Sequence, residues 1–386
     1  MISENKIVIS KIDGKFFSCH IVDGKSVDIY SYDSIVNPLQ IGTIINGKVE
    51  KNLPDISSCF VRIDSKISAF LNKSVKPETI IQVQIQKPAF GSKKATVTDN
   101  LSISGVLVVL SNDFVGVRVS NKAKNSMVNL SVLENYAKEL NVGVIIRTKA
   151  FDDEVEVQDI IEEIDYIYEK INYIRSQSNN RPLYHVFYRP LPEIIDDCIS
   201  LISSGNVNEI VTDIDEIYNL LNNHNDFPAY YIKLIDQVKI RLYIDELLSL
   251  SKLYAFETKI SEATSRRIYL DNGANITFDQ TEALLAIDVN SASVKGKMIS
   301  KEENVLLINK EAAKEIFRHF RLRSLCGIIM IDFINMKSKE SYDELEKYIN
   351  ELASNDCVKL KFHGFTKLGL AEISRQKTKE VFSIRG

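Results

Sequence analysis

Two apolar runs that each carry one aspartate constrain the fold of this chain more than any other feature. The runs span residues 283–290 and 327–334 and place Asp288 and Asp332 at corresponding positions. Apolar runs of this length are typical of strands that are buried on both faces of a sheet. The segment between them repeats its apolar residues at spacings of three and four, which predicts an amphipathic helix. Strand, helix and strand form a crossover unit, so the two strands should be parallel and close together.

The two aspartates are the strongest sign of chemistry in the sequence. They lie near the carboxyl ends of the predicted strands, where open α/β sheets place their sites. Neighbouring carboxylates in apolar surroundings are costly unless a cation lies between them, and hard divalent ions prefer oxygen ligands. We therefore expect Asp288 and Asp332 to bind Mg²⁺, with Mn²⁺ as the alternative ion, in a site that activates water. Asn290 shares the face of Asp288 and should orient it or contact a substrate.

A structural interpretation of the same aspartates stays open at this point. Each carboxylate alone is as well explained by capping a helix or by pairing with a buried arginine. The matched pair, taken together with Asn290, favours the metal site over that alternative.

Two groups of basic residues lie close to these runs in the sequence. One group shares a face of the predicted helix, where it would neutralise phosphate groups beside the metal ion. Its members are Lys310, Lys314, Arg318 and Arg321. In the other group, Lys359, Lys361 and His363 alternate with apolar residues, which predicts a half-buried strand with one basic face. Charge alone favours the alternative that both are ordinary solvent-exposed faces.

The composition argues against a membrane protein and gives no general attraction to nucleic acid. The chain has 386 residues and a net charge of −4, and no apolar run approaches the ~18 residues that span a bilayer. Its length predicts about two to four domains. The five cysteines are scattered without a Cys-x-x-Cys pair, and the first residues lack a secretory signal, so we expect reduced thiols in the cytoplasm.

The periodicity changes several times along the chain. Short strands broken by Asp-Gly turns at residues 13–14 and 23–24 come first. Residues 41–100 alternate with a period of two and predict a small barrel. Further strands and a long helical pattern follow, and then a polar linker at residues 176–182 leads into a mainly helical region.

The predicted barrel offers side chains that suit a single-stranded nucleic acid. Phe60 and Phe70 lie in strand context, and Lys93 and Lys94 follow a glycine-serine pair. Aromatic platforms next to lysines hold single strands on OB-type barrels by stacking and by attraction to phosphates. The alternative is that both phenylalanines are core residues, which their residue type alone favours.

In the order and spacing of its motifs, the chain resembles the ribonuclease E/G family. The resemblance covers nearly the whole chain, being dense in the last third and thin in the helical middle. The matching blocks are residues 279–284, 286–292, 311–313, 321–323, 327–334, 369–370 and 372–376.

The resemblance implies an α/β (α+β) multidomain fold with an interrupted layout. An RNase H-like subdomain is split, an S1-type OB-fold barrel and a 5′-sensor region are inserted in it, and a DNase I-like catalytic α/β subdomain follows. The implied ranges are 1–38 and 183–262 for the two RNase H-like parts, 39–100 for the barrel, 101–182 for the sensor region and 263–386 for the catalytic subdomain.

The resemblance also implies roles for individual residues. Asp288 and Asp332 match the metal-binding aspartates of the family, and Asn290 matches its catalytic asparagine. The positions that hold RNA near the scissile bond are Phe60, Phe70 and Lys93.

A pocket for a terminal 5′-monophosphate is implied in the same way. Arg147 and Thr148 match the pair that holds the phosphate, and Gly105 and Val109 match backbone positions beside it. Lys359 stands where the family supports the sensor with arginine, and because lysine lacks the planar fork, we expect a weaker 5′-end preference. The alternative for Arg147 is a structural ion pair with the acidic residues 152–154.

These expectations combine into one function with two competitors. We expect a Mg²⁺-dependent endoribonuclease that hydrolyses single-stranded RNA, such as rRNA or mRNA precursors, to 5′-phosphate and 3′-hydroxyl ends. The zinc-linking Cys-x-x-Cys of the family is absent from the sequence, so we expect no zinc and, if a homodimer forms, not a zinc-linked one. The competitors are a catalytically silent RNA-binding protein of the same fold and a metal-dependent DNase.

Overall fold

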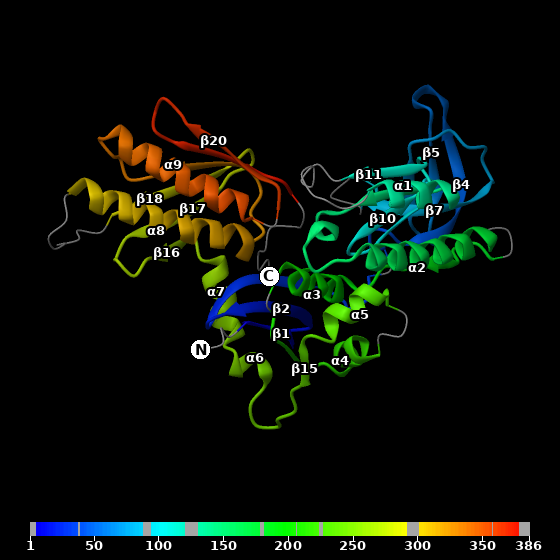
Figure 1. Ribbon diagram of the computed structural model, residues 1–386, viewed down its shortest axis with the longest axis horizontal. Helices are drawn as coiled ribbons and strands as arrows, with labels where there is room; N and C mark the ends of the chain where they lie inside the picture. Colours follow the sequence, from blue (N-terminus) through cyan, green and yellow to red (C-terminus); the bar gives the residue numbers. More distant parts are fainter. Residues whose placement is uncertain are drawn as a thin grey trace. The chain divides into compact units, whose positions relative to one another are not determined.

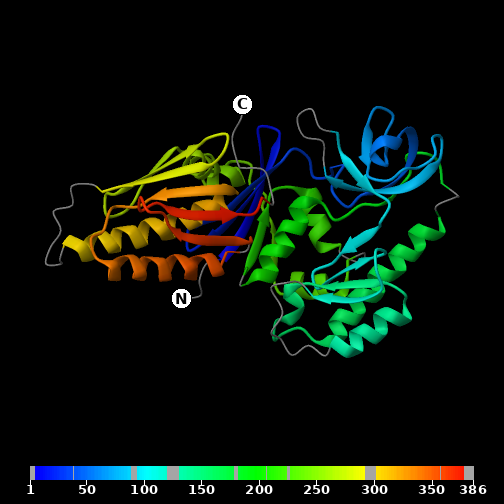
Figure 2. The ribbon, with the colours of Figure 1, turned by 90° about the horizontal axis from the view of Figure 1, so that it is seen from above.

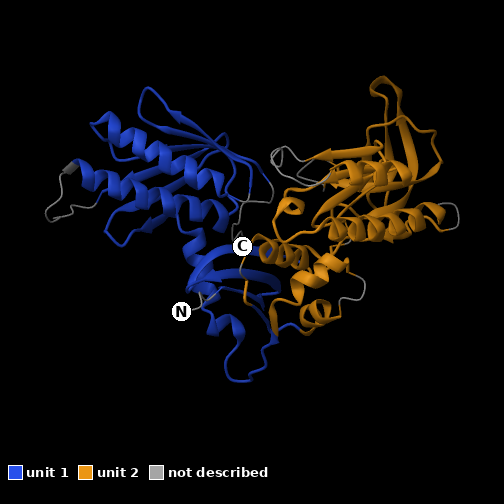
Figure 3. Cartoon of the chain, in the orientation of Figure 1, with its two compact units in different colours: residues 1–33, 209–214, 241–386 blue, residues 34–208, 215–240 orange. Residues whose placement is uncertain are grey.

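The computed structural model divides the chain into two compact units (Figure 3). Unit 1 comprises residues 1–33, 209–214 and 241–386, and unit 2 comprises residues 34–208 and 215–240. No helix in the described part of the chain is long and apolar enough to cross a lipid bilayer. The structure describes residues 5–37, 39–87, 94–119, 130–177, 181–205, 207–223, 227–291, 301–356 and 358–377.

A closed five-stranded barrel forms the first part of unit 2. Its strands follow the order β4-β5-β6-β8-β7, and antiparallel pairing of β4 with β7 closes it. The predicted barrel is thus confirmed, and its core consists of every second strand residue, as the period of two requires. The strands are β4 (Ile44–Leu53), β5 (Ser58–Arg62), β6 (Ser68–Leu71), β7 (Ile80–Lys87) and β8 (Thr96–Thr98), with the short helix η1 (Pro54–Ile56) after β4 and β13 (Val186–Tyr188) paired to β4 outside the barrel.

A four-stranded sheet with the order β11-β12-β10-β9 follows in unit 2 (Figure 1). Two helices pack on it, α1 against β11 and α2 against β9 and β10. The bounds are β9 (Ser102–Ser104), β10 (Val108–Ser111), β11 (Gly116–Val119), β12 (Gly143–Ile146), α1 (Leu130–Glu139), η2 (Thr148–Phe151) and α2 (Val157–Ser176). The remaining helices of unit 2 are α3 (Glu193–Ser204), α4 (Asp215–Asn222) and α5 (Ala229–Ile235).

Unit 1 contains a five-stranded sheet whose strands come from two segments that are far apart in the sequence. Its order is β15-β14-β1-β2-β3, and β1 pairs in parallel with β14, which comes about 200 residues later in the chain. The Asp-Gly turns at 13–14 and 23–24 are confirmed, since all four residues have positive φ as a type I′ hairpin requires. The elements are β1 (Asn5–Ile12), β2 (Lys15–Val22), β3 (Lys25–Tyr32), β14 (Glu209–Thr212), β15 (Lys239–Leu242), α6 (Leu250–Leu253) and α7 (Phe256–Thr264).

A six-stranded sheet forms the rest of unit 1, with the order β16-β17-β18-β19-β21-β20. Helices α8 and α9 lie along the same face of this sheet and close its hydrophobic core (Figure 2). The mixed α/β class expected from the sequence is confirmed by these layers. The elements are β16 (Arg267–Tyr269), β17 (Asn275–Gln280), β18 (Leu285–Asn290), α8 (Lys301–Leu322), β19 (Gly327–Asp332), α9 (Lys339–Ser354), β20 (Leu360–Phe365) and β21 (Ala371–Arg375).

Candidate functional site

Strands β18 and β19 place the two aspartates side by side. The strands are parallel neighbours, as predicted, and Asp288 is the direct register partner of Asp332. Neighbouring strands lie about 4.8 Å apart, so both carboxylates are within reach of one ligand. Because directly paired residues point to the same face, the crossover brings together two residues that are 44 positions apart in the sequence.

The expectation that these strands are buried on both faces is wrong. Ile287 and Ile331 face the core under α8 and α9, whereas Asp288 and Asp332 are exposed on the opposite face. The helices cover only one side of the sheet, so alternate residues on the other side remain open to solvent. The carboxylates therefore avoid the cost of burial and are accessible to a ligand.

Two further polar residues share the open face with the aspartates. The amide Nδ2 of Asn290 donates a hydrogen bond of 2.5 Å to Oδ2 of Asp288. Thr277 of β17 lies directly opposite Asp288 in the antiparallel pair, and only 6% of it is exposed. Its Oγ1 finds no hydrogen-bond partner within the described residues, which is unusual for a buried hydroxyl. Sequence reasoning missed Thr277, although its alternation with Ile276 and Phe278 was the available signal.

The structural alternatives for the two aspartates gain no support. No lysine or arginine in the described ranges forms an ion pair with Asp288 or Asp332. The helix that follows β19 is capped by Ser338, whose side chain accepts a hydrogen bond from the backbone N–H of Ser341. Two unpaired carboxylates with an adjacent amide and an unsatisfied hydroxyl form a set of oxygen donors that suits a hard divalent cation.

The basic residues of α8 are not part of this open face. The helix packs on the opposite side of the sheet, so the expectation that its basic face lies beside the carboxylates is wrong. Lys310 lies 2.5 Å from Glu344 of α9, and Arg318 contacts Glu315 and the carbonyl oxygen of Ser26. Lys314 is exposed. The contacts of Lys310 and Arg318 favour a structural role for these two residues.

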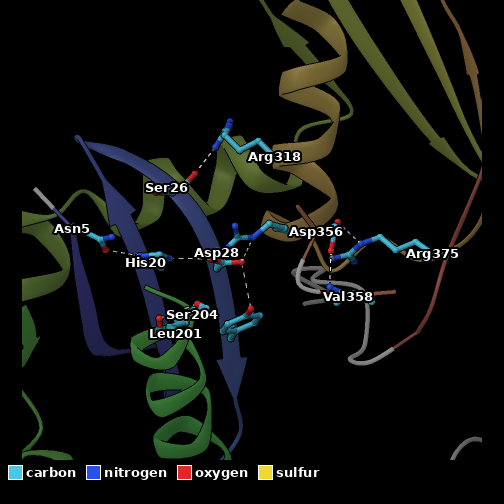
Figure 4. Close-up of polar contacts among 12 residues, drawn as sticks. Asn5, His20, Ser26, Asp28, Leu201, Ser204, Arg318, Asp356, Val358 and Arg375 are labelled. Atoms are coloured by element: carbon cyan, nitrogen blue, oxygen red, sulfur yellow. Dashed lines mark hydrogen bonds and ion pairs between the residues drawn. The ribbon is translucent and has the colours of Figure 1, made fainter. Parts of the chain in front are cut away.

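Arg321 belongs to a buried polar cluster that ties α8 to the five-stranded sheet. Its guanidinium donates two hydrogen bonds, of 3.2 and 2.7 Å, to the carboxylate of Asp28 on β3. Asp28 is only 1% exposed and also contacts His20, which in turn contacts Asn5 (Figure 4). Burial opposes ionisation of Asp28, but the hydrogen bond with His20 and the charge of Arg321 hold its pKa below the usual value.

A second polar group surrounds the buried His319 of α8 and includes Arg323, which follows the end of this helix. Arg323 donates a hydrogen bond of 2.8 Å from Nε to Nδ1 of His319, so this nitrogen is an acceptor and the imidazole is neutral. Burial lowers the pKa of His319 to about 4. Against its own burial, hydrogen bonds with His319 and Arg318 lower the pKa of Glu315 to about 2.

The barrel presents its two phenylalanines as a pair on the outer surface. Phe60 and Phe70 are register partners on β5 and β6, and their rings meet edge to face with centroids 6.0 Å apart. Both are half-buried, and neither belongs to the barrel core, which contains their neighbours in the strands. The ammonium group of Lys94 lies 4.4 Å from the ring centroid of Phe60. Lys93 lies outside the described residues.

Four of the five predicted sensor residues lie near one end of β12. Arg147 and Thr148 are exposed directly after this strand, and the Arg147 guanidinium donates a hydrogen bond to the carbonyl oxygen of Gly105. Val109 of β10 pairs with Ile145 of β12, two residues before Arg147. Of the acidic residues 152–154, Asp152 is paired with Lys149 at 2.7 Å. The exposed Lys359 belongs to unit 1, whereas the other four residues belong to unit 2.

Comparison with known proteins agrees with this arrangement of motifs. The model of the ribonuclease E/G family matches residues 102–378, which include both aspartates. The chain is 29% identical to ribonuclease E of a Synechocystis species, over 88% of this chain and 52% of that protein. It is 29% identical to ribonuclease G of Haemophilus influenzae, over 88% of this chain and 73% of the relative.

Another relative is matched almost from end to end. A putative ribonuclease E of Buchnera aphidicola subsp. Baizongia pistaciae is 26% identical over 96% of this chain and 95% of its own length. The chain spans about half the length of the Synechocystis protein and of a Nostoc ribonuclease E, 52% and 51% respectively. The family model nevertheless covers well over half of this chain. The chain belongs to the ribonuclease E/G family.

Proposed function

We propose that this chain is a metal-dependent endoribonuclease that hydrolyses single-stranded RNA to 5′-phosphate and 3′-hydroxyl ends, in RNA processing and decay. The observation that carries the proposal is the pairing of Asp288 with Asp332 on the open face of a sheet, with Asn290 bonded to Asp288. Family membership supports RNA as the substrate, as do relatives that are named ribonucleases.

The donor set fits Mg²⁺, and Mn²⁺ has the same ligand preference. Asp288 and Asp332 would hold the ion. The Oγ1 of Thr277, which has no hydrogen-bond partner among the described residues, would be available for a hydrogen bond within the same site. When bound, the ion would supply Lewis-acid stabilisation of the negative charge that develops on the phosphate. Asn290 fixes the orientation of the Asp288 carboxylate, and its amide keeps a second N–H for a substrate oxygen.

The surfaces of unit 2 would hold the RNA strand. Phe60 and Phe70 offer half-exposed ring faces for stacking on bases, and Lys94 adds positive charge next to Phe60. Arg147 and Thr148 would bind a terminal 5′-monophosphate, because a guanidinium and a hydroxyl can donate several hydrogen bonds to its oxygens. In this proposal the five-stranded sheet is the split RNase H-like subdomain, and the six-stranded sheet with α8 and α9 is the DNase I-like subdomain.

One assay with matched substrates tests the proposal. A fluorescent single-stranded RNA and a DNA of the same sequence are incubated with the chain in Mg²⁺ or in EDTA, and the products are separated on a gel. We expect the RNA alone to be cut, only with the metal ion, and at internal positions. Binding of RNA without cutting would instead identify a silent RNA-binding protein, and equal cutting of DNA would identify a DNase.

A further inference from the structure

Glu163 lies in the core of unit 2 and binds a turn of backbone with its carboxylate. It belongs to α2, and only 1% of it is exposed. Its two oxygens accept hydrogen bonds from the backbone N–H groups of Val106, Leu107 and Val108, at 3.0, 2.8 and 2.8 Å. Three consecutive N–H groups that point to one place form a site for an anion, and here a side chain of the chain itself fills it.

Gly105 precedes these three residues and allows the carboxylate to approach. A Cβ atom at position 105 would lie 2.3 Å from Cδ of Glu163, and 2.4 and 2.6 Å from its two oxygens. No side chain fits in that space, so the absence of a Cβ at Gly105 is a condition for the contact. The carboxylate and the glycine thus depend on each other, although they are 58 residues apart.

The same turn holds Arg147 at two points. The guanidinium of Arg147 donates to the carbonyl oxygen of Gly105, and its backbone N–H donates to the carbonyl oxygen of Leu107 at 2.8 Å. Glu163 therefore contacts the turn from the core, and Arg147 contacts it from the surface. Burial raises the pKa of Glu163, while the three N–H groups and the charge of Arg147 act in the opposite direction.

We propose that Glu163 is the positioning residue of the 5′-phosphate site, and that it gives Arg147 its orientation by fixing the turn of residues 105–108. Because Glu163 already occupies the three N–H groups, an RNA 5′-phosphate is left to Arg147 and Thr148 at the surface. This inference rests on the proposed binding of a 5′-monophosphate there, and it predicts that 5′-end discrimination depends on a side chain that touches no RNA.

The test compares binding of two RNAs that differ only at the 5′ end. A 3′-labelled single-stranded RNA carries either a 5′-monophosphate or a 5′-hydroxyl, and its affinity for the full chain is measured by fluorescence anisotropy in EDTA. Glu163→Gln keeps the shape but turns one acceptor into a donor that faces backbone N–H groups, so we expect the monophosphate preference to fall roughly tenfold. The affinity for the 5′-hydroxyl RNA should stay unchanged. Arg147→Ala should also lower the preference for the monophosphate. The double variant Glu163→Gln/Arg147→Ala should lose no more of this preference than Arg147→Ala alone.

The chain offers a matched control in the same sheet. Glu134 of α1 accepts a hydrogen bond of 2.6 Å from the backbone N–H of Val117, and a Cβ at Gly116 would lie 2.8 Å from its carboxylate oxygen. Gly116 pairs with Gly143, at the end of β12 that is opposite to Arg147. Glu134→Gln should therefore leave the 5′-end preference as it is in the wild type.

The outcomes separate this inference from the proposed function. A folded Glu163→Gln variant with full preference, or a wild type without any preference, would overturn the inference. If Glu163→Gln unfolds at the assay temperature, Gly105→Ala, which pushes on the same carboxylate from the other side, is measured in its place with the same expectation. Cleavage in Mg²⁺ is scored separately, so an inactive wild type refutes the endonuclease while the binding ratio still decides the role of Glu163.

Discussion

Asp288 and Asp332 are exposed side by side on an open sheet face, whereas Asp28 and Asp356 of the same unit are buried and each is bound by an arginine. Asp356 receives hydrogen bonds of 3.0 and 3.1 Å from Arg375, which is itself 5% exposed (Figure 4). A buried charge needs a partner to repay its desolvation, while an exposed charge does not.

The difference between the two pairs of carboxylates separates structure from chemistry. The buried carboxylates already accept hydrogen bonds from arginines on other elements: Asp28 from Arg321, which is 293 residues away, and Asp356 from Arg375, which is 19 residues away. The exposed carboxylates repel each other and have no cationic partner within the described residues, so they are the ones that a bound cation would stabilise. Substitutions in the two groups should therefore act on different measurable quantities.

The largest effect is expected at the exposed pair. Asp288→Asn or Asp332→Asn removes an anionic oxygen ligand and should lower the cleavage rate by about three orders of magnitude or more. The melting temperature should change little, because both side chains are solvent-exposed. Cleavage rate and thermal melting are measured in parallel on the same preparations.

Asp279→Asn is the matched control for this prediction. Asp279 lies on the adjacent strand β17 but is bound by Arg266 at 2.5 Å, so its loss should leave the rate close to that of the wild type. Full activity in Asp332→Asn would remove the carboxylate pair from the mechanism.

The opposite result is expected at the buried carboxylate. Asp28→Asn removes the buried negative charge that is paired with Arg321 and should destabilise the fold by about 3–5 kcal/mol. Urea denaturation measures this loss, and the cleavage rate per folded molecule should stay unchanged. Asp33→Asn, which removes an exposed ion pair with Lys15 just after the same strand, should change stability by less than about 1 kcal/mol. Equal losses in both variants would contradict the distinction.

The sequence predicted the position of the exposed pair better than its environment. The crossover rule and the matched runs placed Asp288 opposite Asp332 in parallel strands, which the structure confirms. Local periodicity also identified the barrel and the two Asp-Gly hairpins. It did not reveal that helices cover only one face of the sheet, because an apolar run looks the same in both cases.

Sequence periodicity does not predict which residues form contacts across long separations in the chain. Arg321 was expected on a solvent-exposed basic face, but its partner Asp28 lies 293 residues away, and no spacing within α8 reveals it. Glu163 leaves only a weak signal in the sequence, since it interrupts the apolar stripe of α2 between Ile160 and Ile167. A carboxylate at a core position of an amphipathic helix indicates a buried partner, but not which one.

The buried group around His319 should make stability depend on pH. Its pKa is about 4 in the fold and about 6.5 when unfolded, so the unfolded chain binds more protons between these values. The contribution of the neutral His319 to the free energy of unfolding is therefore fully present above pH ~6.5. It is lost as the pH falls toward 4, and the loss is about 2 kcal/mol at pH 5. Urea denaturation at pH 7 and pH 5 measures it. His319→Gln should remove most of this difference, and a wild type with the same stability at both pH values would contradict the buried neutral histidine.

The half-exposed phenylalanines of the barrel should behave like the exposed aspartates. Phe60→Ala and Phe70→Ala should each weaken RNA binding by about 1–3 kcal/mol if the rings stack on bases. The melting temperature should fall less than in Val61→Ala, which removes a side chain from the barrel core. Affinity is measured by anisotropy on folded protein. A large fall in melting temperature with unchanged affinity would make both rings structural.

The smallest effects are expected at single lysines, one on the proposed RNA-binding surface and one away from it. Lys94 lies over the ring of Phe60 on the proposed RNA surface, whereas Lys314 is exposed on α8, on the face of the six-stranded sheet that is opposite to Asp288 and Asp332. Removing one phosphate contact lowers the slope of log affinity against log salt concentration by about 0.7 for a single strand. We expect this change in Lys94→Ala and none in Lys314→Ala, from RNA affinities measured between low and high salt. A lowered slope in Lys314→Ala would show that the basic face of α8 contacts RNA phosphates. An unchanged slope in Lys94→Ala would show that Lys94 contacts no phosphate, which contradicts its place in the proposed binding site.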